Sequence, residues 1–287
     1  MFLIIGTVVV FVCVLGGYVA MGGHLEVLMQ PFELVIIGGA ALGAFIIASP
    51  KPVLFGSFKA VGLLLKGPKY KKDAYLELLT LLFAVFKLAK SKGMLALESH
   101  VENPEESTLF EQFPIFCKDH HAVTFLCDYL RMLTLGTENP HEMEALMDEE
   151  IETHHHEQMQ IANAFQTVAD GMPALGIVAA VLGVIKTMGS ITEPPEVLGK
   201  LIGGALVGTF LGVFLAYGFI GPMAGSLKAI FDSEVKYYMC MKAGILAFLQ
   251  GHPPQIAVEF ARKALMSEVR PSFYELEDAV SELPALT

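Results

Sequence analysis

The chain has 287 residues, of which 54% are hydrophobic and only 17% are charged. That balance lies outside the usual range of a soluble domain and predicts a polytopic membrane protein with a substantial aqueous part. The formal net charge of −11 argues against a nucleic-acid partner, because a phosphate-binding surface needs clustered lysine and arginine. The cysteines lack the spacing of a disulfide framework or a zinc site, and we expect no metal and no cofactor. They are Cys13, Cys117, Cys127 and Cys240.

Four apolar segments are long enough to cross a ~30 Å hydrocarbon core, which takes about 20 helical residues. They cover residues 2–21, 32–49, 173–191 and 201–223. The first segment lacks the positive start and the cleavage site of a signal peptide, so we interpret it as a membrane helix. Short loops join the first two and the last two segments, which predicts two helical hairpins separated by a long polar insertion. We assign Glu33 to the first short loop, so that none of the four segments carries a carboxylate.

The polar insertion and the C-terminal part show helical periodicity without a sustained strand pattern, so the predicted fold is all-α. Residues 52–67 combine apolar side chains with the widely spaced Lys59 and Lys66, and we expect this segment to lie in the membrane surface. Residues 78–86, LLTLLFAVF, are too short an apolar run to span and are typical of a core helix in an aqueous domain. The acidic tail from Pro271 is expected to be loosely ordered.

These segments divide the chain into four parts. We predict a transmembrane hairpin at 1–50, a cytoplasmic helical domain preceded by the interfacial helix at 51–168, a second transmembrane hairpin at 169–223, and a cytoplasmic helical extension with the acidic tail at 224–287. Lysines follow the second and fourth spans, whereas the short loops within the hairpins hold acids, so the positive-inside rule places both termini and the insertion in the cytosol. The basic residues concerned are Lys51, Lys59, Lys66, Lys69, Lys71, Lys72, Lys228, Lys236 and Lys242.

Two prolines, Pro173 and Pro222, stand at one end of the third and fourth spans. Each removes one backbone hydrogen bond, and frees the carbonyl of Ala169 or Gly218, if its helix continues through it. The third span enters the membrane at Pro173 and the fourth returns at Pro222, so the two prolines are expected at similar depth. One interpretation is a pair of hinges, and the other is that Pro173 merely occupies the first turn of a helix capped by Asp170. The matched depth favours the hinges.

The fourth span carries Gly204, Gly208 and Gly212 four residues apart, which lets another backbone approach one helix face. Simple helix packing explains this face, alone or within an oligomer interface. Because the spans carry no carboxylate in this interpretation, a conducting chain needs a partner that supplies the ion carrier. Mid-membrane polarity comes from Thr209, with Tyr217 nearer the cytosolic end, although a lone membrane threonine most often bonds its own helix backbone.

The four-helix arrangement with its long insertion, together with ADGMPALGIVAAVLGVIKTMG, GGALVGTFLGVFLAYGFIGPMA and KSKGMLALESHVENPEES, resembles the MotA family of bacterial flagellar stator subunits over essentially the whole chain. The complete first hairpin favours this family over its more distant relatives, the ExbB and TolQ energisers of outer-membrane transport. An energiser of that type and a non-conducting membrane scaffold remain the alternatives. The resemblance implies a multi-pass protein of the inner membrane. The sequence shows no nucleophile with an adjacent base and no phosphate loop, so we do not expect an enzyme.

The resemblance also implies partners and mechanism. Five A subunits are expected around two B subunits of the MotB type, whose single transmembrane helices each bring one ion-binding aspartate. Ion passage is expected to turn the A ring, which pushes a rotor protein of the flagellar switch complex and so supports motility and chemotaxis.

Residue roles follow from the same resemblance. Pro173 and Pro222 match prolines implicated in conformational coupling, and Thr209 matches a threonine that faces the B helix. Glu98 in MLALESH matches one rotor-facing charge, and Lys90 in LAKSKGM its basic counterpart, with Lys92 close enough to leave the choice open. From the residues alone, Lys90 and Glu98 could equally be solvated surface charges.

The ion path is expected to be lined by Thr209, Ala180 and Tyr217. At the position of Ala180, the resemblance implies that sodium-driven relatives have a threonine or serine. Since sodium needs several oxygen ligands and alanine offers none, the sequence favours protons. The run His154–His156 invites a metal site, but consecutive helical residues point about 100° apart and cannot converge on one ion.

Overall fold

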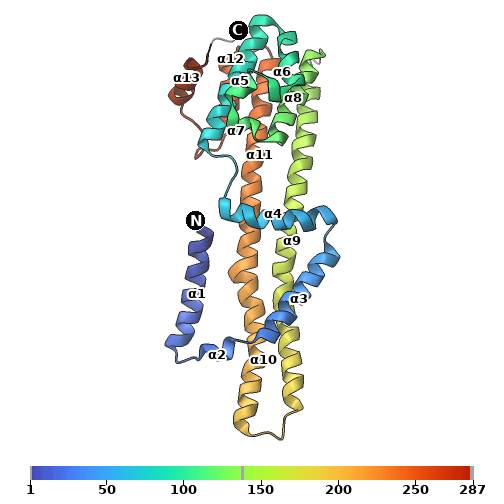
Figure 1. The fold of residues 1–287 in the computed structure, drawn as a ribbon, viewed down its shortest axis with the longest axis vertical. Helices are drawn as coiled ribbons and strands as arrows, with labels where there is room; N and C mark the ends of the chain where they lie inside the picture. The colour runs from blue at the N-terminus through green and yellow to red at the C-terminus, as the bar shows by residue number, and fades with distance from the viewer. Residues whose placement is uncertain (1, 137–138, 285–287) are drawn as a thin grey trace. The chain divides into compact units, whose positions relative to one another are not determined.

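The computed structural model describes residues 2–136 and 139–284, and every regular element within them is a helix (Figure 1). Four of these helical segments are long and apolar enough to cross a membrane, namely Leu3–Ala20, Leu25–Ala48, Pro140–Met188 and Pro195–Leu249. The all-α class and the four spans are therefore confirmed. The last two segments extend far beyond their apolar parts.

The described chain forms two compact units. Unit 1 extends to Gly67 and resumes over Glu157–Ala229, whereas unit 2 comprises Pro68–His156 and the residues from Ile230 onward. The segment expected in the membrane surface thus folds with the apolar helices, as do residues 157–168. The assignment of these parts to membrane and cytosol stays a prediction.

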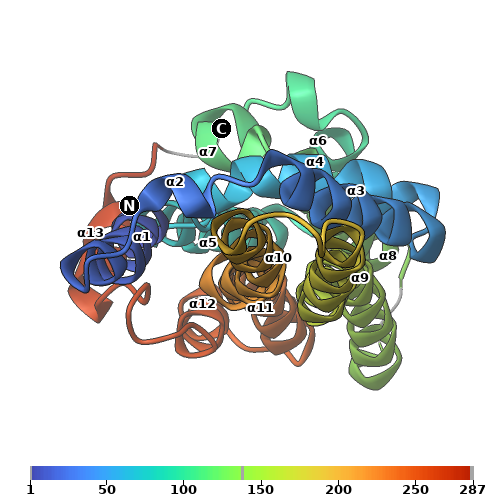
Figure 2. The same ribbon diagram turned by 90° about the horizontal axis from the view of Figure 1, so that it is seen from below.

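Unit 1 is built from helices that pack along the α9–α10 pair. Its elements are α1 (Phe2–Ala20), α2 (Leu25–Leu28), α3 (Pro31–Ala48), α4 (Lys51–Lys66), part of α9 (Pro140–Met188), α10 (Pro195–Leu215), the π-helical turn η4 (Ala216–Ile220) and the start of α11 (Gly221–Leu249). α3 and α4 lie along one side of the α9–α10 pair, and α4 runs crosswise to α9 (Figures 1 and 2). α1 contacts α10 and η4 through Phe11, whose ring lies 5.7 Å from that of Phe214 and 5.1 Å from that of Phe219.

α4 has two unlike faces. Its buried residues recur three or four positions apart and therefore share one face; they are Val53, Ser57, Ala60 and Leu64. The opposite face exposes Phe55 and Phe58, which are 70% and 72% accessible, beside the exposed Lys51, Lys59 and Lys66. An apolar strip flanked by lysines is the pattern of a helix that lies in a membrane surface.

Unit 2 has a separate core around α5. Its elements are α5 (Lys72–Lys92), the short 3₁₀ turns η1 (Met94–Leu97), η2 (Pro104–Glu106) and η3 (Phe110–Gln112), α6 (Glu98–Glu102), α7 (Pro114–Cys117), α8 (His120–Thr134), α12 (Pro254–Lys263) and α13 (Phe273–Ser281), with the remaining parts of α9 and α11. The run 78–86 is buried throughout, which fits the core helix expected from its length.

A buried carboxylate ties the start of unit 2 together. Asp119 caps α8, accepts a short hydrogen bond from the Tyr70 hydroxyl, and pairs with Lys69 at 2.8 Å. Burial alone would raise the pKa of Asp119, but the hydrogen bonds from Lys69 and Tyr70 outweigh it and hold the pKa below the usual range of an aspartate. The Tyr70 ring in turn stacks on Tyr237 of α11, with 3.7 Å between the ring centroids.

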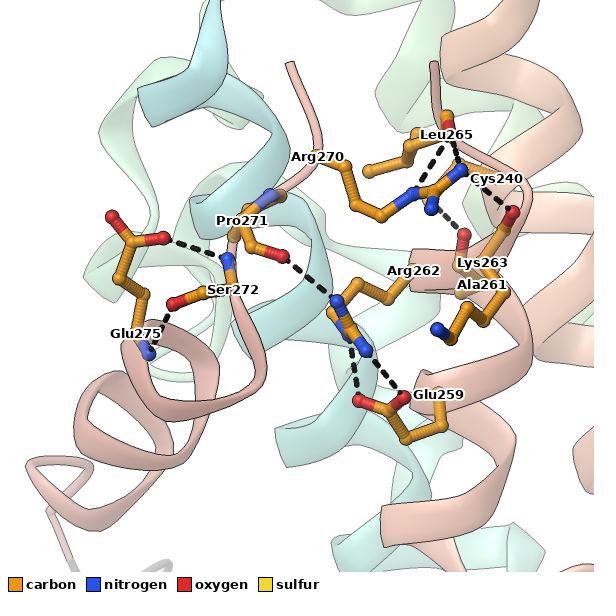
Figure 3. A network of polar contacts seen from close by, with 10 residues as sticks. All are labelled: Cys240, Glu259, Ala261, Arg262, Lys263, Leu265, Arg270, Pro271, Ser272 and Glu275. Carbon is orange, nitrogen blue, oxygen red and sulfur yellow. Dashed lines mark hydrogen bonds and ion pairs between the residues drawn. The ribbon is translucent and has the colours of Figure 1, made fainter. Parts of the chain in front are cut away.

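The described part of the acidic tail contains the helix Phe273–Ser281, so the expectation of loose order is wrong for residues 271–281. Arg262 on α12 forms a fork with Glu259 at 2.7 and 2.8 Å and donates to the Pro271 carbonyl at 2.9 Å (Figure 3). Ser272 and Glu275 then form a capping box that starts α13 (Figure 3). Glu275 also pairs with Lys72 at 2.6 Å. Acidic composition suggested disorder, but these capping and pairing contacts hold the tail in place.

Candidate functional site

The α9–α10 pair meets backbone to backbone at glycines. A Cβ placed on Gly212 would lie 2.7 Å from the Met172 carbonyl oxygen and 2.8 Å from the Gly176 Cα. A Cβ on Gly176 would lie 2.8 Å from the Gly208 carbonyl oxygen. These distances are shorter than any normal contact, so this crossing requires residues without side chains.

The three glycines of α10 have different neighbours. Gly212 contacts the α9 backbone, whereas a Cβ on Gly208 would lie 3.0 Å from both the Ala180 amide nitrogen and the Glu33 Oε2 atom. A Cβ on Gly204 would meet the Gln30 side chain at 3.1 Å. The glycine face of α10 therefore packs against α9 near Gly212 and Gly208. Near Gly208 and Gly204 it packs against polar side chains from the start of α3.

The opposite face of α10 is open in the single chain. The accessible residues of this face recur at helical spacing and continue into η4; they are Ile202, Leu206 and Val213 of α10 and Tyr217 of η4. Leu206 is 64% and Tyr217 67% exposed, and the half-buried Thr209 lies between them on the same face. Thr209 is the one hydroxyl within α10. The site residues Thr209 and Tyr217 thus share one apolar stripe, and Ala180 lies at the level of Gly208, one residue before Thr209.

The two prolines lie inside continuous helix. Pro173 is an interior residue of α9, which excludes its placement in the first turn of a helix that begins at Asp170. Pro222 follows the π-helical turn η4, in which the Gly221 amide donates to the Ala216 carbonyl five residues back. A π-turn beside a proline is a recognised cause of local helix irregularity.

The prolines lie close to the same depth of unit 1, separated by about one helical turn. A Cβ on Gly221, the residue before Pro222, would lie 3.9 Å from the Cβ of Ala169. Ala169 is the residue whose carbonyl Pro173 leaves without its helical donor. Gly221 thus faces a residue one helical turn, ~6 Å, before Pro173, so the two prolines are near each other in depth but not level, and their role as paired hinges stays a prediction.

One residue of this region escaped the sequence reasoning. Glu33 belongs to α3 and to the second span, so the statement that the four spans lack a carboxylate is wrong. Its Oε2 atom is buried and has no hydrogen-bond partner among the described residues. The sequence did contain the indication, because residue 33 lies inside the apolar segment 32–49. Its assignment to the loop followed from its place at the very start of that segment, in the first turn of the helix.

The charges expected to face a rotor lie where α5 ends. Lys90 and Lys92 are exposed in the last turn of α5, Gly93 reverses the chain with φ +88°, and Glu98 opens α6. Within the described residues, neither Lys90 nor Glu98 forms an ion pair. Between them Leu95 is 73% exposed. Unit 2 thus presents unpaired charges of both signs on one connection.

Lys92 differs from Lys90 in its surroundings. Burial lowers the pKa of His100, and the positive charge of Lys92 lowers it further. The charge of Lys92 is thus felt by His100 on α6. Among the described residues, Lys90 has no comparable charge interaction with a titratable side chain.

The histidine run does not gather into a metal site. Nε2 of His155 lies 3.4 Å from Asp232, while the His154 ring lies beside Tyr238 and His121. Within residues 2–136 and 139–284, no group of three or more His, Cys, Asp or Glu side chains could hold a metal ion.

Comparison with known proteins identifies the family. Residues 4–93 match the family described as motility protein A N-terminal, and residues 119–239 match the MotA/TolQ/ExbB proton channel family. The chain is 48% identical to motility protein A of Salmonella typhimurium over 98% of its own length and 95% of that protein. It is 34% identical to the chemotaxis protein LafT of Vibrio parahaemolyticus, with 97% and 98% covered.

Solved structures agree with this assignment. The fold resembles the flagellar MotAB stator complex from Bacillus subtilis with a TM-score of 0.71 and 27% identity, covering 89% of this chain and 92% of the other. It resembles C. jejuni MotAB with a TM-score of 0.77, 22% identity and coverage of 94% and 98%. The relatives that match over nearly the full length are motility and chemotaxis proteins, which argues against a transport energiser. The match to a proton channel family argues against a passive scaffold and against an enzyme. The chain is a membrane protein that belongs to the motility protein A family, the A subunits of the flagellar stator.

Proposed function

We propose that this chain assembles with a B subunit in the bacterial inner membrane, both termini in the cytosol, and that ions pass along the open face of α10. The B subunit is expected to contribute a single helix with an ion-binding aspartate, and five A subunits are expected to surround two B subunits. The names of the two solved MotAB structures support a B partner. The observation that carries the proposal is the exposed apolar stripe of α10, which suits contact with another membrane helix.

The residues of this stripe receive the ion-path roles. Thr209 offers the hydroxyl nearest the expected aspartate, and Tyr217 offers a second polar group toward the cytosolic end. Ala180 lies opposite Gly208 and brings no oxygen ligand. Since a sodium site needs several oxygens and a carboxylate needs only water to exchange a proton, the conducted ion is the proton.

The prolines and the charged connection complete the cycle. Pro173 and Pro222 weaken the two helices within about one turn of each other, so a change at the ion site can bend α9 and α11 there. Lys90 and Glu98 then act on a rotor protein of the flagellar switch complex. Their lack of ion pairs within the described chain leaves both charges available to a partner.

Cysteine crosslinking to the B helix tests the central step. Val213 lies on the open stripe and Val207 is 4% exposed on the same helix, so the two positions form a matched pair. In a background without the native cysteines, Val213→Cys should crosslink to a cysteine in the B helix, and Val207→Cys should not. Equal crosslinking of both positions, or of neither, would refute the placement of the B helix on this stripe.

Swimming assays test the coupling and rotor roles. Pro173→Ala should abolish swimming while the A and B subunits still copurify, whereas Pro195→Ala, in the first turn of α10, should swim normally. Lys90→Glu should reduce torque more than Lys92→Glu, with Lys87→Glu as the exposed control on the same helix. The reverse order would assign the basic contact to Lys92.

A further inference from the structure

Glu33 is the feature of unit 1 that the proposed cycle does not use. Its carboxylate lies at the α9–α10 crossing, where a Cβ on Gly208 would be 3.0 Å from Oε2 and a Cβ on Gly183 would be 3.6 Å from Oε1. Both flanking positions are glycine, so neither supplies a side-chain donor. The two helices form a notch that admits the carboxyl group.

The depth of this notch differs from what the helix position of Glu33 suggests. Glu33 is in the first turn of α3, but its carboxyl group lies beside Gly208, which is about 10 Å along the helix axis from residue 201, where the predicted span begins, and about 20 Å from Pro222 near its end, at ~1.5 Å per residue. The carboxyl group therefore lies inside the predicted span, in its non-cytosolic half. Gly208 immediately precedes Thr209 along that helix.

The surroundings of Glu33 are poor in compensating groups. Oε2 is buried without a hydrogen-bond partner among the described residues. The charged group that acts on it is Lys186, one turn beyond Gly183 on α9, and the nearby polar neighbour on the glycine face is Gln30. An ionised carboxylate is costly in such a place, and an intramembrane acid that faces the helix bundle commonly marks an ion pathway.

Gln30 and Glu33 together form a polar seam from the α2–α3 junction to the Thr209 level. A Cβ on Gly204 would meet the Gln30 amide, and one on Gly208 would meet the Glu33 carboxyl, so the seam follows one face of α10. In the proposed orientation this junction is on the non-cytosolic side, from which protons enter.

We propose that the Glu33 carboxyl is a second proton-accepting group of the stator, on the entry side of the ion path. This inference rests on the proposed proton conduction. Glu33 takes a proton from water that reaches the seam and releases it again to water at the depth of Thr209, whose side chain lies on the open face of the same helix, so charge and protons balance without another reactant. The group shuttles a proton and does not replace the carrier of the B subunit.

The test measures proton influx into cells that express this chain with its B subunit, as the fall of cytosolic pH reported by a fluorescent indicator. Glu33→Gln keeps the size and hydrogen-bonding ability of the side chain but cannot carry a proton. It should lower influx by about tenfold or more, whereas Glu33→Asp should retain most of it. Glu26→Gln, at an exposed acid of α2, is the matched control and should conduct as the unaltered protein does.

Copurification with the B subunit separates conduction from assembly. The expected result is that Glu33→Gln assembles normally, conducts poorly, and shows a weaker dependence of influx on external pH. Normal influx in Glu33→Gln would overturn the inference, and so would loss of assembly, because Glu33 would then only dock α3. If the unaltered pair passes no protons, the proposed proton conduction itself fails.

Discussion

Adding a single methyl group at Gly212 should force the α9–α10 pair apart. In Gly212→Ala the new Cβ would lie 2.7 Å from the Met172 carbonyl oxygen and 2.8 Å from the Gly176 Cα. Both obstacles are backbone atoms, so no side-chain rotation relieves them. The helices must separate by roughly 0.5–1 Å, and a gap of that size forfeits a quarter to a half of the dispersion energy of each neighbouring contact.

The expected loss is about 1–3 kcal/mol, the usual cost of overpacking, partly offset by about 1 kcal/mol because alanine is a better helix former than glycine. Gly203→Ala is the matched control on the same helix, since the nearest atom to its Cβ would be Val27 Cγ1 at an ordinary 3.8 Å. It gains the helix propensity without the clash.

Thermal unfolding of the purified complex in detergent checks this prediction. Gly212→Ala should unfold at a lower temperature than the unaltered protein, and Gly203→Ala at the same or a higher temperature. If both variants unfold alike, the close approach of the two backbones does not contribute to stability and the reasoning is refuted.

Three further predictions concern other parts of the chain. Asp119→Asn should lower the free energy of unfolding by about 1–3 kcal/mol and with it the unfolding temperature. Because the folded pKa of Asp119 is depressed, its contribution is present above pH ~4 and is lost as the pH falls further, so the deficit of the variant should shrink in acid melts. Replacing Lys51, Lys59 and Lys66 together by Gln should abolish the extra stabilisation by phosphatidylglycerol over phosphatidylcholine, at about 1 kcal/mol per lysine, and an unchanged lipid preference would contradict the surface role of α4. Arg262→Lys should expose α13 to proteolysis, because lysine cannot reproduce the fork with Glu259, while Lys263→Gln should not.

Much of the architecture was predictable because membrane-spanning helices obey length and composition. An apolar run of about 20 residues has few alternatives to a membrane helix, so the four spans followed from counting. The similar depth of Pro173 and Pro222 was expected from antiparallel topology alone, although the contacts place them about one helical turn apart. Motif resemblance supplied the candidate roles of Lys90, Glu98 and Thr209, which composition could not.

Only the tertiary structure decided which faces meet. The three glycines of α10 look alike in the sequence, yet Gly212 receives a backbone, Gly208 a carboxylate and Gly204 an amide. Glu33 resembled a loop residue because its neighbours along the chain are a short turn, but its carboxyl group reaches the middle of α10. The acidic tail resembled a disordered segment, but Arg262 on the preceding helix and Lys72 from a distant part of the sequence supply its partners. Local sequence determines which segments become helices and how deep they lie, whereas side-chain partners across helices depend on packing that no single segment contains.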